Sequence, residues 1–216
     1  MHNRSLVTCF QQELRPCFTK YSNIPFRNEK REFIMTDILI VVDMQRDFVS
    51  GVLGSPQAQA IVPAVAERML RAQNEGTPIV LTLDTHEEDY MDTREGRFLP
   101  IPHCIQGTEG WALEPEIGKA CCRGMISFEK PTFGSTALMH HVAALALEKG
   151  FVGGKGMTIE LCGVCTDICV VSNALLIKAV LPEADLVVNS TLCAGVTPQK
   201  HEAALETMRS CQISVL

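Results

Sequence analysis

Three cysteines lie within eight positions of the chain, in the segment LCGVCTDICVVSNALL at residues 161–176. They are Cys162, Cys165 and Cys169, and thiols this close can bind a metal, form a redox pair, pack in a core or supply a nucleophile. A structural zinc site needs a second ligand pair, and the sequence has no other C-x-x-C and no suitably spaced pair of histidines. We therefore interpret Cys162 as a core residue and Cys165 as part of a turn.

Cys169 has a different setting, because it falls in the first turn of a predicted helix that follows a buried strand. The amino end of a helix stabilises an anion, so a thiol there becomes a thiolate more readily. An isolated cysteine is most often a buried structural residue. Two polar residues at the ends of neighbouring predicted strands, Asp43 and Lys130, reverse that balance and favour a nucleophile.

Asp43 closes the apolar run ILIVV, where a carboxylate is costly unless it is paired. A helix cap or a surface turn would explain the residue without any chemistry. Beside a thiol, the same carboxylate could act as a general acid and base. Both interpretations of Asp43 are compatible with the sequence, and the second one pairs it with Cys169.

A second group of polar residues lies in the segment DTHEEDYMDTREGRFLPIPHC. It contains Asp84, His86, Glu95 and His103, and the D-x-H pair at a predicted strand end with a later histidine is typical of a divalent-metal site. Aspartate and histidine are also common in loops that bind nothing. His140, His141 and His201 fall within predicted helices, and we interpret them as structural.

Buried strands alternate with helices along the chain, which predicts an α/β fold with a mostly parallel sheet. The predicted strands are DILIVVDMQ, TPIVLTLDTH, GMISFEK, GMTIELCGV, ADLVVNSTLC and QISVL. The predicted helices are residues 60–75, STALMHHVAALALEKG, TDICVVSNALLIKAV and TPQKHEAALETMRS. Ligands of such sheets bind beyond the carboxyl ends of the strands, so the polar residues that end the first four strands are expected to converge on one edge.

Composition and charge exclude several classes of protein. The chain has 216 residues, 46% of them hydrophobic, which suits one globular domain with a full core. Its net charge of −6 and the lack of a basic run argue against nucleic-acid binding.

No apolar run reaches membrane-spanning length and no signal peptide is evident, so we expect a cytoplasmic protein with reduced thiols and no membrane partner. No G-x-G-x-x-G follows the first strand and no phosphate-binding G-x-x-x-x-G-K-[ST] is present, which disfavours dinucleotide and nucleotide enzymes.

Residues 1–34 mix charged, amide and proline residues without sustained periodicity. We interpret them as a disordered amino-terminal extension or the result of a misassigned start, and residues 35–216 as the folded domain.

Five segments of that domain together resemble the isochorismatase-like cysteine hydrolases, and most closely their nicotinamidase branch. In chain order they are IVVDMQRDF, DTH, PHC followed by GT and GW, EKPTFGS, and CGVCTDICV. The resemblance covers residues 37–216. It implies the fold of that family, a three-layer α/β/α arrangement around a doubly wound, six-stranded parallel sheet of order 3-2-1-4-5-6.

The resemblance also implies a catalytic set of Asp43, Lys130 and Cys169. In the family the cysteine attacks an amide carbon and forms a thioester that water hydrolyses, the aspartate carries the proton and the lysine supports the thiolate. The oxyanion hole would be the backbone N–H groups of Cys165 and Cys169. A cis peptide bond is expected between Val164 and Cys165.

The nicotinamidase branch holds a metal, usually zinc, that binds the pyridine nitrogen of the substrate. Asp84, His86 and His103 match its ligands, and Glu95 is the candidate for the fourth. Some members place an aromatic residue shortly before the last histidine, where this chain has Pro100; Phe48 and Phe98 are the candidates to line the pocket instead.

The function implied is a small-molecule amidohydrolase, converting nicotinamide to nicotinate and ammonia. A related amidase acting on a carbamoyl or ureido compound is the first alternative, since it would need no metal for a pyridine ring. A non-catalytic, thiol-sensing protein of the same fold is the second. The family also leads us to expect a homo-oligomer.

Overall fold

The structure is a computed structural model that describes residues 35–216, so the interpretation of residues 1–34 lies outside the described part of the chain. Six parallel strands form one sheet in the order β3-β2-β1-β4-β5-β6. The strands are β1 (Ile38–Val42), β2 (Ile79–Asp84), β3 (Ile126–Lys130), β4 (Thr158–Val164), β5 (Asp185–Ala194) and β6 (Ser214–Val215). The order and the parallel direction confirm the predicted fold class.

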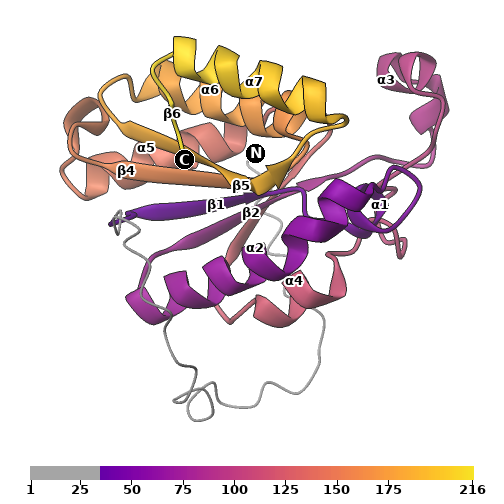
Figure 1. The fold of residues 1–216 in the computed structure, drawn as a ribbon, viewed down its shortest axis with the longest axis horizontal. Helices are drawn as coiled ribbons and strands as arrows, with labels where there is room; N and C mark the ends of the chain where they lie inside the picture. Colours follow the sequence, from indigo (N-terminus) through magenta and orange to yellow (C-terminus); the bar gives the residue numbers. More distant parts are fainter. Residues whose placement is uncertain (1–34) are drawn as a thin grey trace, which may run out of the picture. The chain divides into compact units, whose positions relative to one another are not determined.

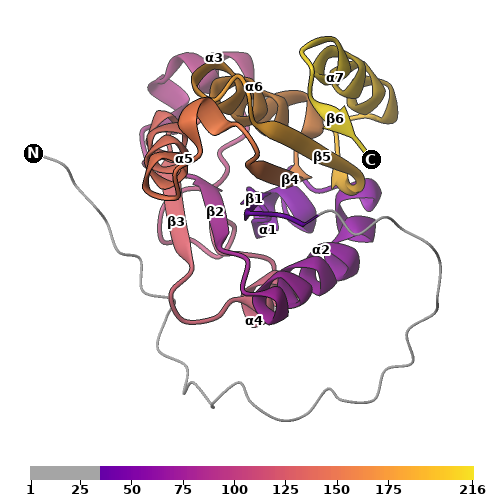
Figure 2. The same ribbon diagram turned by 90° about the vertical axis from the view of Figure 1, so that its left-hand side faces the viewer.

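Helices cover both faces of this sheet (Figures 1 and 2). One face carries α2 (Pro56–Glu75) and α4 (Pro115–Ala120), and the other carries α5 (Thr136–Glu148), α6 (Val171–Val180) and α7 (Pro198–Ser210). Because the central strands are packed from both sides, every residue of β1 and β2 is buried, which explains their continuous apolar sequences. None of the helices within residues 35–216 is long and apolar enough to cross a membrane.

Local signals set the helix ends. The side chains of Ser55, Ser135 and Thr197 accept hydrogen bonds from the first turns of α2, α5 and α7, respectively. Gly76 ends α2 with a φ of 73°, a left-handed conformation that glycine adopts without strain. The end of α2 at Glu75 and the start of α5 after Ser135 agree with the predicted helices, residues 60–75 and STALMHHVAALALEKG. The start of α2 differs, because this helix begins at Pro56.

Short helices lie between the long elements, and the sequence pattern did not predict four of them. These four are α1 (Arg46–Val49), η1 (Tyr90–Asp92), α3 (Arg94–Phe98) and η2 (Val152–Gly154). The fifth is the turn η3 (Thr166–Val170), which lies within the segment TDICVVSNALLIKAV that was predicted to be one regular helix. With the exception of η2, they are in or beside segments at the carboxyl end of the sheet that carry candidate site residues. Each has five residues or fewer, which is too short for hydrophobic periodicity to mark it.

Gly163 in β4 allows the sheet to close against β1. It pairs with Val42, its φ is 116°, and a Cβ at this position would lie 2.1 Å from the carbonyl oxygen of Val42. We expect Gly163→Ala to lower the free energy of unfolding by at least about 2 kcal/mol, from backbone strain and from displacement of β1.

Urea denaturation of the wild type and the variant measures this effect. Gly118→Ala in α4 is the matched control, because a Cβ there meets no atom within 4 Å. We expect the control to raise stability by about 0.5–1 kcal/mol, since alanine suits a helix better than glycine. Equal stability of the two variants would contradict the packing described for β4.

Candidate active site

The carboxyl end of the sheet brings together three side chains that are far apart in the sequence. Asp43 follows β1, Lys130 is the last residue of β3, and Cys169 lies in the turn η3 after β4. The Nζ atom of Lys130 lies 2.7 Å from Oδ2 of Asp43 and 3.4 Å from Sγ of Cys169. Although β3 is two strands away from β1, the long lysine side chain spans the gap across β2.

Asp43 is held in place by the neighbouring strand β2. The hydroxyl of Thr82 donates a hydrogen bond to Oδ1 of Asp43 at 2.6 Å, and the backbone N–H of Asp43 donates to the carbonyl of Thr82 at 3.2 Å. The φ of Asp43 is 49°, an unusual value for a residue other than glycine, and these bonds support it. Sequence reasoning missed Thr82; the available signal was a polar residue inside a buried strand.

Burial and neighbouring charges set the protonation of this group. Desolvation raises the pKa of Asp43, and repulsion from Asp84 adds to the rise while Lys130 opposes it. Desolvation also raises the pKa of the Cys169 thiol well above its usual value, and the charge of Asp43 adds to this. Burial alone would lower the pKa of Lys130, but Asp43, Cys169 and Asp84 raise it instead. Lys130 therefore stays charged, and a carboxylate with a raised pKa is a better acceptor for the thiol proton.

Cys169 lies in a π-helical turn, not in the regular helix that the sequence predicted. The turn η3 precedes α6. The backbone carbonyl of Cys169 accepts a hydrogen bond of 2.8 Å from the side-chain amide of Asn173. The preceding peptide bond between Val164 and Cys165 is cis, in the place where the family resemblance leads us to expect it. Single π-helical turns occur frequently at functional sites, because they redirect a side chain without ending the helix.

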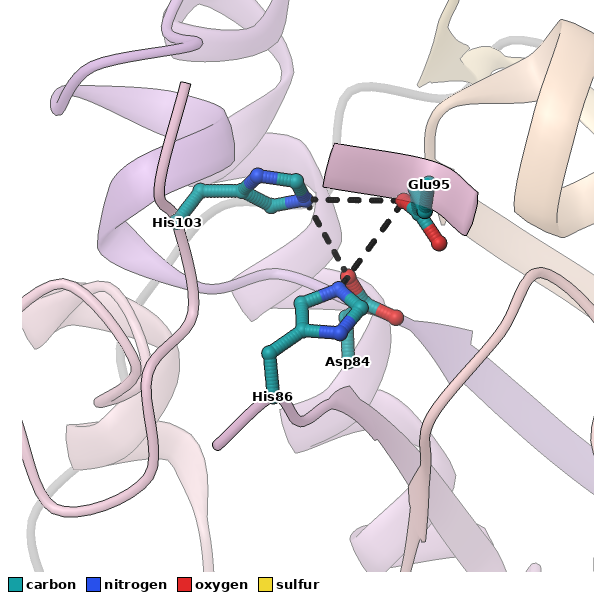
Figure 3. Close-up of side chains that lie close together, drawn as sticks. All are labelled: Asp84, His86, Glu95 and His103. Atoms are coloured by element: carbon teal, nitrogen blue, oxygen red, sulfur yellow. Dashed lines mark hydrogen bonds and ion pairs between the residues drawn. The ribbon is translucent and has the colours of Figure 1, made fainter. Parts of the chain in front are cut away.

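Beside this group lie the four predicted metal ligands, Asp84, His86, Glu95 and His103. One donor atom from each lies within 4.8 Å of the donor atoms of the other three, and Figure 3 shows the side chains pointing toward one another. Nε2 of His86 is 3.0 Å and Nε2 of His103 is 3.5 Å from Oδ2 of Asp84, and both nitrogens are 3.9 Å from Oε1 of Glu95.

The chemistry of this cluster fits a divalent ion such as zinc. Two imidazoles and two carboxylates form a mixed nitrogen and oxygen donor set of the kind zinc accepts. Nδ1 of His103 lies 2.8 Å from the carbonyl of Ile101, so it can donate there and leave Nε2 with its lone pair toward the cluster. Burial raises the pKa of Glu95, and repulsion from Asp84 adds to it, so two acidic groups here favour a cation between them.

Asp84 belongs to both groups of residues. Its Oδ1 accepts from Nζ of Lys130 at 3.0 Å, while its Oδ2 faces the two histidines. Burial would raise the pKa of Asp84, but the bonds to His103 and His86 and the charge of Lys130 lower it well below the usual range. The parallel pairing of β2 with β3 sets Asp84 directly opposite Lys130 and so brings these two side chains into contact.

A cavity of about 330 Å³ opens onto both groups. Its walls include Cys169 and three of the four predicted metal ligands, Asp84, Glu95 and His103. The apolar part of the lining comes from Phe48, Leu53, Ala58, Leu99, Phe133, Val164, Ile168, Ala194 and Val196.

Of the two aromatic residues predicted to line the pocket, the structure places one there. Phe48 lines the cavity, and its ring centroid is 5.4 Å from that of His103. Phe98 does not line it: this side chain is 78% exposed and borders a neighbouring cavity, whose lining also includes His86 and Glu95. In α3, Glu95 is part of the cluster, whereas Phe98, three residues later, lies largely at the surface. Phe133 is the aromatic residue that sequence reasoning missed.

Cys162 and Cys165, which are close to Cys169 in the sequence, have simpler positions. Cys162 is fully buried in the core, as predicted, and Cys165 lines the cavity at the start of the turn. Among the described residues, Cys104, Cys162, Cys165, Cys169, Cys193 and Cys211 are free thiols.

Comparisons with known proteins agree with this geometry. The family model for the isochorismatase domain matches residues 37–216. A protein from Bacillus subtilis strain 168, described as the uncharacterised isochorismatase family protein PncA, is 30% identical over 183 residues, which cover 79% of this chain and 93% of the relative.

Two solved structures share the architecture. The nicotinamidase/pyrazinamidase PncA from Bacillus subtilis is 26% identical with a TM-score of 0.69, covering 84% of this chain and 99% of the other. The pyrazinamidase of Pyrococcus horikoshii in complex with zinc is 30% identical with a TM-score of 0.67, covering 83% and 97%.

Proposed function

This chain belongs to the isochorismatase family, and from that premise we propose that it is a cysteine amidohydrolase that converts nicotinamide to nicotinate and ammonia. One observation carries the proposal: a single cavity is lined both by Cys169 and by the candidate metal ligands Asp84, Glu95 and His103. A flat molecule with a carboxamide on one side of its ring and a basic nitrogen on the other could therefore contact both groups at once. The likeness to a pyrazinamidase crystallised with zinc supports the same substrate class.

In the proposed mechanism, Cys169, Asp43 and Lys130 each have one role in the proton transfers and bond changes. The Cys169 thiol passes its proton to Asp43 as its sulfur attacks the amide carbon, and Lys130 stabilises the negative charge on sulfur. The C–N bond breaks and Asp43 returns the proton to the leaving nitrogen, so that ammonia departs and a thioester remains. Water, deprotonated by Asp43, then cleaves the thioester to the acid and restores the thiol. The backbone N–H groups of Cys165 and Cys169 are proposed to hold the oxyanion in both steps.

Asp84, His86, Glu95 and His103 would hold the divalent ion. When bound, the ion supplies a Lewis acid that can accept the ring nitrogen of the substrate and so orient the carboxamide. The residues of the cavity exclude water from the thiol and restrict the ring, with Phe48 and Phe133 on its walls.

Ammonia release from nicotinamide tests the proposal. We expect turnover by the wild-type chain, a fall of at least about tenfold after chelation, and recovery on addition of zinc. A tenfold fall corresponds to the loss of about 1.4 kcal/mol of transition-state stabilisation, which the ion would supply by orienting the substrate. Benzamide is the matched control substrate, since it differs from nicotinamide only in the ring nitrogen. Its slower turnover should not depend on the metal.

Three outcomes separate the possibilities. Absence of ammonia from nicotinamide with zinc-loaded protein would contradict this substrate and direct the search to carbamoyl and ureido amides. Equal turnover of benzamide and nicotinamide would contradict the role of the ring nitrogen. Turnover that survives complete metal removal would contradict the role of the ion.

A further inference from the structure

A buried carboxylate that is not one of the four predicted ligands connects the loop of His103 to α1, the short helix that follows β1. Asp47 lies in α1, and its Oδ2 accepts a hydrogen bond of 2.8 Å from the backbone N–H of Cys104, the residue after His103. We propose that Asp47 is a positioning residue that fixes the two histidines of the metal cluster. This inference rests on the metal site of the proposed function. It gives a role to Asp47, which is not one of the four predicted ligands.

Cys104 connects Asp47 to both histidines. Its N–H donates to Asp47, its chain neighbour is His103, and its carbonyl accepts from the backbone N–H of His86 at 3.0 Å. The backbone N–H of Gln106 in turn donates to the carbonyl of His86 at 2.8 Å. One carboxylate bond therefore fixes a segment that carries one ligand and pairs with the backbone of another.

The conformation of Cys104 needs such support. Its φ is 47°, in the left-handed region that a residue other than glycine seldom adopts. A residue in that region is kept there by its surroundings, which must hold the peptide groups on either side. Asp47 holds the N–H before this torsion and His86 holds the carbonyl after it.

The chain leaves space for this carboxylate at two glycines. A Cβ on Gly110 would lie 2.2 Å from Oδ2 of Asp47, and a Cβ on Gly51 would lie 2.7 Å from Oδ1. Gly110 has no positive φ, so the space it leaves, and not its backbone freedom, explains the glycine. Its carbonyl also accepts from the backbone N–H of Asp47 at 3.0 Å. Asp47 thus holds the loop at residue 104 through its side chain and at residue 110 through its backbone.

The next residue of α1 acts on the same histidine directly. The ring of Phe48 contacts that of His103, with the two planes inclined by 60°. The short helix α1 therefore places a carboxylate behind the loop and an aromatic ring against its ligand. Residues that orient metal ligands typically change metal affinity by about 10- to 100-fold when they are replaced.

Zinc affinity of the purified full chain tests the inference, measured by competition with a chromophoric chelator and without any substrate. We expect Asp47→Ala to raise the dissociation constant by about 10- to 100-fold, because the N–H of Cys104 loses its acceptor and the loop relaxes. Asp47→Asn keeps an acceptor oxygen and should have a smaller effect. Gly110→Ala should act like Asp47→Ala, because its methyl group displaces the carboxylate from outside. The visible spectrum of cobalt-loaded protein should change in the same variants.

Asp37→Ala is the matched control. Oδ2 of Asp37 accepts from the backbone N–H of Thr158 at 2.8 Å, which is the same kind of bond at the opposite end of the sheet. It should lower stability without changing zinc affinity. Folded Asp47→Ala and Gly110→Ala proteins with affinities within about twofold of the wild type would overturn the inference, as would an equal loss in Asp37→Ala.

Three further outcomes distinguish this inference from the proposed function. If Asp47→Ala does not fold, Asp47→Asn and Gly110→Ala decide the question by the same measurement. A wild-type chain that binds no zinc would overturn the inference, while ammonia release would still test the amidase proposal by itself. Conversely, a chain without nicotinamide turnover can still show the expected loss of zinc affinity.

Discussion

Replacing Cys169 by alanine is expected to lower nicotinamide turnover by about 10⁴-fold or more, because the variant has no atom that can form the thioester. The buried methyl group occupies part of the space of the thiol, so folding should persist. Steady-state ammonia release measures turnover, and circular dichroism together with zinc affinity shows that the fold and the cluster remain. Mass spectrometry of quenched wild-type reactions should show an acyl adduct on Cys169 that the variant lacks.

The matched control for this variant is Cys211→Ala. Cys211 follows α7 and takes no part in the cavity, so its replacement should leave turnover unchanged. A Cys169→Ala protein that keeps more than a small fraction of wild-type turnover would rule out a thioester at this residue. If the wild type also turns over no amide but is alkylated selectively at Cys169, the thiol-sensing alternative becomes the better account.

Replacing Lys130 by methionine is expected to have the largest effect on stability. Lys130 is 1% exposed and lies between two buried carboxylates, those of Asp43 and Asp84. Methionine fills a similar volume but leaves both carboxylates without their cation, and removal of one partner from a buried ion pair typically costs about 3–5 kcal/mol. Turnover should fall as well, since the thiolate loses its nearest positive charge.

Urea denaturation of metal-free protein measures the stability change, and Asp43→Asn tests its cause. Combined with Lys130→Met, Asp43→Asn removes one of the stranded carboxylates, so the double variant should be more stable than the sum of the single changes predicts. Lys155→Met, which changes an exposed lysine, should have little effect. Additive effects, or a Lys130→Met protein as stable as the wild type, would contradict the electrostatic account.

The fold could be predicted because its signals are local. Continuous apolar runs such as ILIVV mark strands buried on both faces, and Ser135 and Gly76 mark helix ends by hydrogen bonding and backbone conformation. The same pattern placed Asp43 and Asp84 at strand ends, and therefore at the ligand-binding edge of the sheet. The order of the strands came from the family resemblance, since periodicity does not specify which strands are neighbours.

The rest of the site depends on contacts that no single segment encodes. The meeting of Lys130 with Cys169 depends on strand register and on the reach of a lysine side chain across β2. Phe98 was proposed for the pocket because Pro100 stands where some family members have an aromatic residue. It is largely exposed and borders the neighbouring cavity, while Phe133 from a different loop lines the cavity beside Cys169. Thr82 gave only a weak signal, one polar residue within a buried strand. Loop paths follow tertiary packing, which local propensity does not determine.

The two oxygens of Asp84 have a thermodynamic consequence. One oxygen accepts a hydrogen bond from the ammonium group of Lys130, which lies beside Cys169, and the other oxygen faces the two histidines. A single carboxylate therefore takes part in two equilibria. Equilibria that share a group are linked, and linkage is reciprocal: by whatever factor the ion changes the affinity of Cys169 for a covalent or bound adduct, the adduct changes the affinity for the ion by the same factor. Measuring the ion's dissociation constant with the thiol free and with it blocked would therefore give the coupling free energy between the two halves of the site.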